Sequence, residues 1–360
     1  MQDASCFSKS YTEARARFLV AAEAAGAKLR SFPVASVSGE GLTVDVATIG
    51  NADDPTILTS SGVHGVEGFF GSAVQLALLE QLQRQDRPGT RHVLIHAVNP
   101  FGFAQLRRFN EDNVDLNRNF LTKVEQYAGS PDGYARLDSF LNPKSPPMRF
   151  EAFKLKAIWK ILRHGLETLK QSVAGGQYEF PDGIFYGGHE PCESTRIVCE
   201  NCGEWLGESD RIVHVDFHTG LGRFGSYKLL LAETADSPSY DWYVDAFGDE
   251  TVEPFDTGQR KSTAYQVTGL FGGWMLPHFA SRKYRFATAE FGTYDVVRVL
   301  GAIRAENRAH HYDVVTSDAY QAAKAELLEC FCPADVTWRT RVLASGLRII
   351  DQAEDALGSL

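Results

Sequence analysis

The sequence predicts an α/β fold with a largely parallel sheet. Residues 92–98 form a near-continuous apolar run, typical of a strand that is buried on both faces of a parallel sheet. A strand-like segment at 56–60, a helical segment at 68–82 and this run follow in the order of a crossover between parallel strands. The length of 360 residues and the 44% hydrophobic content allow a large core. We therefore predict one domain over residues 1–360.

The remaining elements follow from local patterns. Residues 11–29, with charged residues interspersed, predict an amphipathic helix, and residues 42–49 predict a strand that a polar turn separates from 56–60. The helix at 68–82 has apolar residues near 3.6-residue spacing. Residues 121–190 are rich in proline and irregular, so we expect an insertion that holds a helix at about 149–172. Further strands are predicted at 211–218, 227–232 and 285–291, and extra C-terminal helices from about 296, at 296–310, 319–328 and 335–357.

Charge and hydropathy exclude some classes of partner. The net charge of -10 argues against nucleic acid and against a polybasic membrane-binding surface. The chain has no apolar stretch near the roughly 20 residues that span a bilayer. Its N-terminus also lacks a basic region followed by an apolar core, so we predict a cytoplasmic location.

The six cysteines predict free thiols. Cys199 and Cys202 form a CxxC motif, and Cys192 lies seven residues upstream of the first of them. A structural zinc site is closed by four ligands, and the sequence offers no second CxxC.

His64 and Glu67 are a candidate metal-binding pair. The HxxE spacing alone is weak evidence, because His164 and Glu167 repeat it in the middle of a predicted helix. The first pair instead follows a predicted strand, and open α/β sheets bind ligands at the carboxyl ends of their strands. A catalytic zinc takes three protein ligands, and His218, at the end of the strand predicted at 211–218, is the best third candidate. Alone, it would more often be a hydrogen-bonded structural histidine.

A GxGxxG pattern follows this histidine, at Gly220, Gly222 and Gly225. A dinucleotide-binding fingerprint requires a helix directly after the glycines. Because residues 227–232 predict a strand, the glycines are interpreted as a turn between strands.

Polar residues after the strand at 92–98 could hold an anionic substrate. Arg108, Asn117 and Arg118 are suitable types for a substrate carboxylate or a developing oxyanion. The alternative for Arg107 and Arg108 is a solvated basic pair. Asp115 could orient a metal-bound histidine from behind.

Glu290 is the candidate general base. It lies near the end of an otherwise apolar run, where an unpaired carboxylate would be costly. Burial would raise its pKa, and a nearby metal cation would oppose that shift.

In this order, the motifs resemble the zinc carboxypeptidase-like metallopeptidases, or funnelins, and are most similar to a poorly characterised bacterial branch. The resemblance covers about residues 56–295 and rests on His64, Glu67, Asn99-Pro100-x-Gly102, Arg108-x-Asn110, the run at 115–120, His218 and Glu290. It implies an α/β fold with a mixed, mostly parallel eight-stranded sheet between helices, and one zinc ion held by His64, Glu67 and His218.

The resemblance also implies the roles of the other site residues. Glu290 would be the general base, Arg108 would polarise the scissile carbonyl, and Asp115 would support the first histidine. Asn117 and Arg118 would grip the substrate carboxylate. Family members often have a mobile tyrosine, for which Tyr265 is the nearest candidate although the match is not clean. Residues 253–274 would set the side-chain preference.

The predicted function is zinc-dependent hydrolysis of an amide or peptide bond next to a free carboxylate, by a metal-activated water. The substrate would be a small peptide or an N-acyl amino acid. An aspartoacylase-like N-acyl amino acid deacylase is the alternative within the superfamily; the nine-residue spacing from Arg108 to Asn117 favours the peptidase. A non-catalytic zinc- or peptide-binding module is the third hypothesis, although such relatives usually lose a ligand or the base. The sequence does not indicate an oligomeric state.

Overall fold

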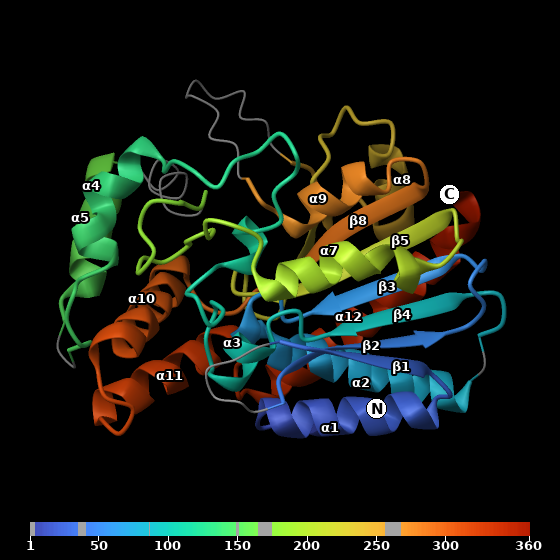
Figure 1. The fold of residues 1–360 in the computed structure, drawn as a ribbon, viewed down its shortest axis with the longest axis horizontal. Coiled ribbons are helices and arrows are strands. Elements are labelled where there is room, and N and C mark those ends of the chain that lie inside the picture. Colours follow the sequence, from blue (N-terminus) through green and yellow to red (C-terminus); the bar gives the residue numbers. More distant parts are fainter. Residues whose placement is uncertain (1–3, 35–40, 86, 149–150, 165–174, 256–267) are drawn as a thin grey trace.

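The fold comes from a computed structural model that describes residues 4–34, 41–85, 87–148, 151–164, 175–255 and 268–360. Within these ranges, eight strands form one sheet in the order β1-β2-β4-β3-β5-β8-β6-β7 (Figure 1). Their bounds are β1 Lys28–Pro33, β2 Thr43–Ile49, β3 Thr56–Ser61, β4 Arg91–His96, β5 Arg211–Thr219, β6 Tyr227–Leu230, β7 Val252–Glu253 and β8 Lys283–Phe291.

The sheet is mixed and mostly parallel, as predicted. The pairs β3–β4, β3–β5, β5–β8 and β6–β7 are parallel, and β1–β2, β2–β4 and β6–β8 are antiparallel. Every residue of β3 and β4 is buried, as is typical of central strands in a mostly parallel sheet. Because β3, β5 and β8 are neighbouring parallel strands, their carboxyl ends meet at one edge of the sheet.

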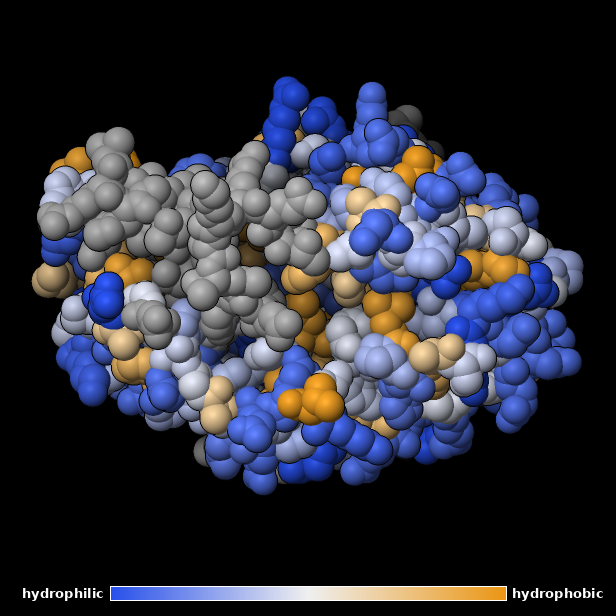
Figure 2. All heavy atoms as spheres, turned by 90° about the horizontal axis from the view of Figure 1, so that it is seen from above, coloured by the Kyte–Doolittle hydropathy of each residue, from blue (hydrophilic) through white to orange (hydrophobic). Residues whose placement is uncertain are grey.

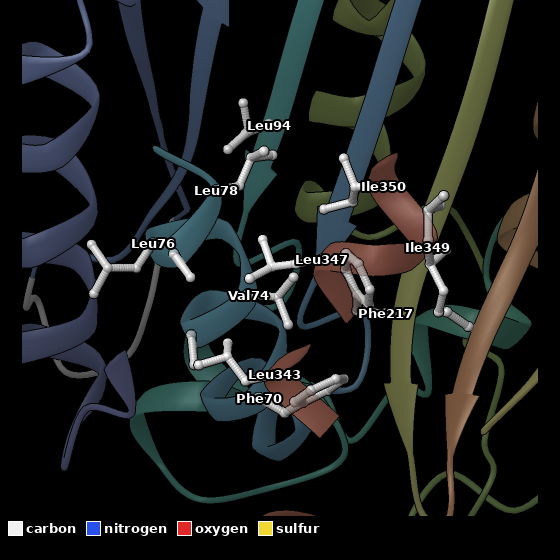
Figure 3. Packing of buried hydrophobic residues seen from close by; sticks show 14 of the residues in the cluster. Phe70, Val74, Leu76, Leu78, Leu94, Phe217, Leu343, Leu347, Ile349 and Ile350 are labelled. Carbon is white, nitrogen blue, oxygen red and sulfur yellow. The ribbon is translucent and has the colours of Figure 1, made fainter. Parts of the chain in front are cut away.

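Helices cover both faces of this sheet. On one face, α1 (Tyr11–Ala24), α2 (Gly68–Arg84), α8 (Tyr240–Phe247) and α12 (Val336–Ala356) share a hydrophobic core with the strands. Figure 3 shows Val74 of α2 and Leu347 of α12 packed together near Phe217 of β5. On the other face, α7 (Glu193–Leu206) and α9 (Phe271–His278) contribute to a second core.

A group of helices lies to one side of the sheet (Figure 1). It comprises α4 (Asp132–Leu141), α5 (Phe153–His164), α10 (Val296–Tyr312) and α11 (Asp318–Phe331). Tyr134, Ile303 and Leu327 belong to its hydrophobic cluster, which also includes Phe109 from the loop after α3 (Pro100–Ala104). Short 3-10 turns complete the chain at η1 Ala4–Cys6, η2 Gly65–Glu67, η3 Leu116–Arg118 and η4 Leu357–Ser359.

Several local predictions need correction. The first helix ends at Ala24, and residues 28–29, which were expected to be helical, belong to β1. Neither β1 nor the two-residue β7 has a predicted counterpart, because β1 is mostly exposed and has no continuous apolar run. The helix predicted at 149–172 is α5, which begins at Phe153, and Glu167 of the second HxxE copy lies outside the described residues.

Other local predictions are confirmed. Gly220, Gly222 and Gly225 all have positive φ between β5 and β6, so the GxGxxG pattern is a turn. Cys199 and Cys202 have free thiols and lie in the helix α7.

Two features of the structure concern hydropathy: the length of its apolar helices and the character of its surface. None of the described helices is long and apolar enough to cross a membrane. In the view from above, the face outside the grey segments is largely hydrophilic, with apolar residues in small groups (Figure 2).

Candidate metal centre

The loop after β3 brings His64 and Glu67 onto one turn. Gly62, with φ 67°, redirects the chain after the strand, and η2 then carries Gly65 to Glu67 directly into α2. A Cβ atom on Gly65 would lie 2.1 Å from the backbone of Gly102, so only glycine allows this close approach to α3. The bend at Gly62 and the close packing of Gly65 on Gly102 together fix this turn.

His218 joins this pair from β5. Its Nδ1 lies 3.2 Å from Nδ1 of His64 and 3.1 Å from Oε2 of Glu67, and His64 Nδ1 lies 2.8 Å from Oε1 of Glu67. One ligand atom from each of the three side chains lies within 4.8 Å of the others, and all three residues are buried. The backbone N–H of Thr219 donates to Glu67 at 3.0 Å and holds the carboxylate in place.

These donors fit a zinc ion. Two imidazole nitrogens and one carboxylate are a usual set for a catalytic zinc, which keeps a fourth position open. Tetrahedral ligands bonded at about 2.0–2.1 Å lie about 3.3 Å apart. The separations of 2.8 to 3.2 Å between these atoms are a few tenths of an ångström below that value.

Each histidine has a buried carboxylate behind it. Asp115 Oδ1 lies 3.1 Å from Nε2 of His64, and Asp216 Oδ2 lies 2.6 Å from Nε2 of His218. Such partners orient a histidine so that its other nitrogen faces a metal. Asp115 was predicted from the sequence in this role, whereas Asp216 was not. The spacing of Asp216, two residues before His218 on one strand, could have indicated it, because such residues face the same side of a sheet.

Arg108 lies at the same cluster. Its Nε donates to Asp115 at 3.0 Å, and its terminal nitrogens lie 2.6 Å from Nε2 of His64 and 3.4 Å from Oε1 of Glu67. The guanidinium also lies over the ring of Phe185, 5.3 Å from its centroid. Phe185 has φ 59°, an uncommon conformation for a bulky residue, and was not predicted from the sequence to lie at the site.

The alternative of a solvated basic pair is wrong for Arg107 and Arg108. Arg107 is fully buried and donates to Glu306 at 2.9 Å, and it also bonds to Asn113 and Asn307. The two neighbouring arginines therefore point into different parts of the molecule.

Asn117 and Arg118 lie on η3, next to Asp115. Asn117 Oδ1 accepts a hydrogen bond from the backbone N–H of Phe271 at 2.9 Å, and its amide nitrogen has no hydrogen-bond partner among the described residues. Arg118 is buried and its NH1 donates to the carbonyl of Asn117. Its charge contributes to the low pKa of Asp115, so it belongs to the same electrostatic environment.

Tyr265 and much of the stretch expected to set side-chain preference lie outside the described residues. The described part contributes to a hollow of about 260 Å³. It is lined by Phe255, Leu270 and Gly273, together with Thr122, Val124, Glu125 and Ala232. Leu270 directly precedes Phe271, which bonds to Asn117.

Glu290 is positioned by the sheet itself. It is the register partner of His218 on β8, and partners in neighbouring strands place their side chains on the same face. Its Oε1 accepts a hydrogen bond from the backbone N–H of Leu221 at 2.8 Å. The site therefore has a carboxylate beside the metal-binding group.

Burial and neighbouring charges separate the pKa values of these acids. Burial opposes ionisation of Glu67, but His64 and His218 together lower the pKa of this carboxyl well below its usual value. Burial likewise disfavours charge on Asp115, whereas Arg108 and His64 bring its pKa down. For Glu290, burial raises the pKa to about 7, and the negative charge of Glu67 adds to the shift.

Comparison with known proteins identifies the family. The family model described as "Protein of unknown function (DUF2817)" matches residues 7–345. The chain belongs to this family. No curated protein matches it.

Several solved structures are similar to the chain at low identity. Bovine thrombin-activatable fibrinolysis inhibitor, in complex with tick carboxypeptidase inhibitor, is 12% identical, with 94% of this chain and 97% of that chain covered and a TM-score of 0.48. A putative metallopeptidase from Shewanella amazonensis is 15% identical over 89% and 93% of the two chains, with a TM-score of 0.43. Murein-tripeptide amidase MpaA from Escherichia coli O157 is 18% identical over 83% and 91%, with a TM-score of 0.36.

Proposed function

We propose that this protein is a zinc-dependent hydrolase that cleaves an amide or peptide bond next to a free carboxylate. One observation carries the proposal: His218 meets His64 and Glu67 from a distant part of the sequence, and Glu290 is the register partner of His218. Three zinc donors next to a carboxylate of raised pKa are what metal-assisted hydrolysis requires.

His64, Glu67 and His218 would hold one zinc ion. When bound, zinc would act as a Lewis acid on the scissile carbonyl and activate water as the nucleophile. Asp115 and Asp216 keep the Nε2 atoms of the two histidines engaged, which leaves both Nδ1 atoms directed at the same point. Thr219 fixes the carboxylate of Glu67 by its backbone N–H.

Glu290 would act as the general base. A base works best when its pKa is near the operating pH, and burial raises the pKa of Glu290 to about 7. The Leu221 N–H holds one carboxylate oxygen, which orients the side chain. The carboxylate would accept a proton from the attacking water and pass it to the leaving nitrogen.

Arg108, Asn117 and Arg118 would handle the negative charges of the substrate. The terminal nitrogens of Arg108 already lie at His64 and Glu67, where an oxyanion would develop during amide hydrolysis. The amide nitrogen of Asn117 and the guanidinium of Arg118 would bind the substrate carboxylate, since both lie on η3 beside Asp115. An N-acyl amino acid presents the same carboxylate, so deacylation would use the same groups.

A substrate library combined with zinc quantitation tests the proposal. The wild-type protein and the variants Glu290→Gln and His64→Ala are purified with zinc, and each is assayed on peptides and on N-acyl amino acids. We expect Glu290→Gln to retain zinc and to lose at least about 100-fold in kcat, because the general base is gone. We expect His64→Ala to lose zinc and activity together.

The outcomes separate the three hypotheses. Turnover of peptides supports the peptidase, and turnover of N-acyl amino acids alone supports the deacylase. A wild-type protein that binds zinc and cleaves neither class would be a binding module. Unchanged turnover in Glu290→Gln would refute the assignment of the base, and a full zinc content in His64→Ala would refute the ligand set.

A further inference from the structure

A row of polar side chains runs behind His218 into the core. His214, Asp216 and His218 alternate along β5 and therefore face the same side of the sheet. Ser60 of β3 is the register partner of Asp216, and Tyr284 reaches the row from β8. All five residues are buried, and none of the outer three has been given a role in the proposed site.

Short hydrogen bonds connect the row without a gap. His218 Nε2 lies 2.6 Å from Asp216 Oδ2, and Asp216 Oδ1 accepts from the Ser60 hydroxyl at 2.6 Å. Ser60 Oγ lies 2.7 Å from His214 Nε2, and His214 Nδ1 lies 2.7 Å from the hydroxyl of Tyr284. The rings of Phe271 and Phe286 pack edge-on against His214, with centroids at 5.3 and 4.7 Å.

The chemistry of these groups fixes the direction of every proton. A carboxylate only accepts, so the single hydroxyl proton of Ser60 is used on Asp216. His214 must then donate to Ser60 from Nε2, and its Nδ1 must accept from Tyr284. Burial agrees with this pattern, because it lowers the pKa of His214 to about 3 and raises that of Tyr284 well above the usual value. His214 is thus a neutral imidazole and Tyr284 a phenol.

We propose that Tyr284, His214, Ser60 and Asp216 form a one-way chain of hydrogen bonds that positions His218 as a metal ligand. The chain ends on Asp216, whose other oxygen accepts from the Nε2–H of His218, so Nδ1 is the atom that His218 presents to the metal. This inference rests on the proposed metal site and assigns it four positioning residues. A carboxylate alone would orient His218, whereas the chain also holds the carboxylate at its second oxygen.

Zinc affinity measured by chelator competition tests this positioning role. We expect Asp216→Asn to weaken zinc binding about 10- to 100-fold, as is typical when a partner behind a metal-binding histidine is lost. Ser60→Ala and Tyr284→Phe should weaken it less, but measurably, because they act through Asp216.

Tyr243→Phe is the matched control. Tyr243 is also a buried tyrosine, and its hydroxyl is hydrogen bonded to Glu233 and to the backbone of Phe286. It forms no hydrogen bond with the four described residues of the proposed hydrogen-bond chain. Its loss should lower stability and leave zinc affinity unchanged. If Tyr284→Phe and Ser60→Ala bind zinc as tightly as Tyr243→Phe, the positioning role is refuted.

Histidine 15N NMR on the metal-free protein provides a second readout. We expect His214 to be the neutral Nε2–H tautomer in the wild type and in Tyr284→Phe, because Ser60 still accepts from Nε2. In Ser60→Ala we expect a mixture of tautomers, because the hydroxyl of Tyr284 can donate to Nδ1 or accept from it. A wild-type His214 with its proton on Nδ1 would overturn the chain even if zinc binds. A wild type with the expected tautomer that binds no zinc would instead refute the metal site and, with it, the positioning role.

Discussion

At the scale of single residues, Arg107 and Arg108 show how neighbours in the sequence acquire unrelated roles. Arg108 lies among the candidate metal ligands, whereas Arg107 is buried against Glu306 of α10. Lys324 of α11 donates to the same carboxylate, so the three charges join the loop after α3 to the helices beside the sheet. Arg107 therefore contributes to the placement of Arg108 without entering the site.

The substitution Arg107→Met should destabilise the protein strongly. Lys324 still pairs with Glu306, but the carboxylate loses one of its two cations, and Asn113 and Asn307 lose their donor. Each buried group left without its partner costs about 1–3 kcal/mol of unfolding free energy. Denaturant-induced unfolding measures the loss. Arg30→Met is the control, because Arg30 pairs with Glu204 on the surface and its loss should cost at most about 1 kcal/mol. Equal losses in the two variants would contradict a structural role for Arg107.

At the scale of elements, His96 links three of them. It is the last residue of β4, its ring stacks on Phe18 of α1 at 4.5 Å, and its Nε2 lies 2.9 Å from the hydroxyl of Ser72 in α2. Burial lowers its pKa to about 4. The folded protein therefore holds this histidine neutral at pH values where the unfolded chain protonates it.

His96 should thus contribute to acid sensitivity. Its pKa is about 4 in the folded state and 6.5 in the unfolded chain, so its contribution is complete above pH 6.5 and is lost as the pH falls toward 4. The loss amounts to about 3 kcal/mol. We expect the stability difference between wild type and His96→Gln to fall by about that amount from pH 7 to pH 4, measured by urea unfolding. His189→Gln, at an exposed side chain, is the control, and a parallel pH dependence of wild type and His96→Gln would contradict the assignment.

The irregular middle segment also acts as an element of the site. The carbonyl of Tyr186 accepts from the backbone N–H of Asp115 at 2.7 Å, and Phe185 packs against Arg108. A stretch that the sequence marks only as an insertion at 121–190 thus holds the loop that carries the candidate anion-binding residues. We propose that it remains part of one domain over residues 1–360, which the single sheet and the packing of α12 on α2 support.

At the scale of the whole molecule, the candidate metal site depends on the pairing of β3 with β5. His64 follows β3 and His218 lies in β5, and the pairing of these strands brings together two residues that are 154 positions apart. The unfolded chain would keep these ligands far apart and bind zinc weakly. Zinc should therefore stabilise the folded state.

Removal of zinc should lower the thermal midpoint. At a free zinc concentration 100 times Kd, binding adds roughly 2.7 kcal/mol to the folded state, which a chelator removes. Differential scanning calorimetry should show a decrease of several degrees in the wild type after chelation. His64→Ala should not respond to the chelator, and an equal response in both proteins would show that the metal binds elsewhere.

The sequence determined the type of fold and most of the candidate site. Apolar runs predicted the central strands. His64, His218 and Glu290 were predicted as site residues because they lie at or near the ends of predicted strands. This works because parallel strands bury their middle residues and gather their carboxyl ends at one edge. The sequence did not identify the exposed edge strand β1, whose residues have no burial pattern to reveal them.

Only the tertiary structure decided which side chains share an environment. Phe185 lies against Arg108, and Arg107 forms a buried ion pair with Glu306, although nothing in their local sequence indicates these roles. The physical reason is that burial, hydrogen bonding and pKa depend on neighbours that long-range strand pairing and helix packing bring together. The HxxE pair was visible in the sequence, but the chain of hydrogen bonds that extends to Tyr284 exists only in the folded sheet.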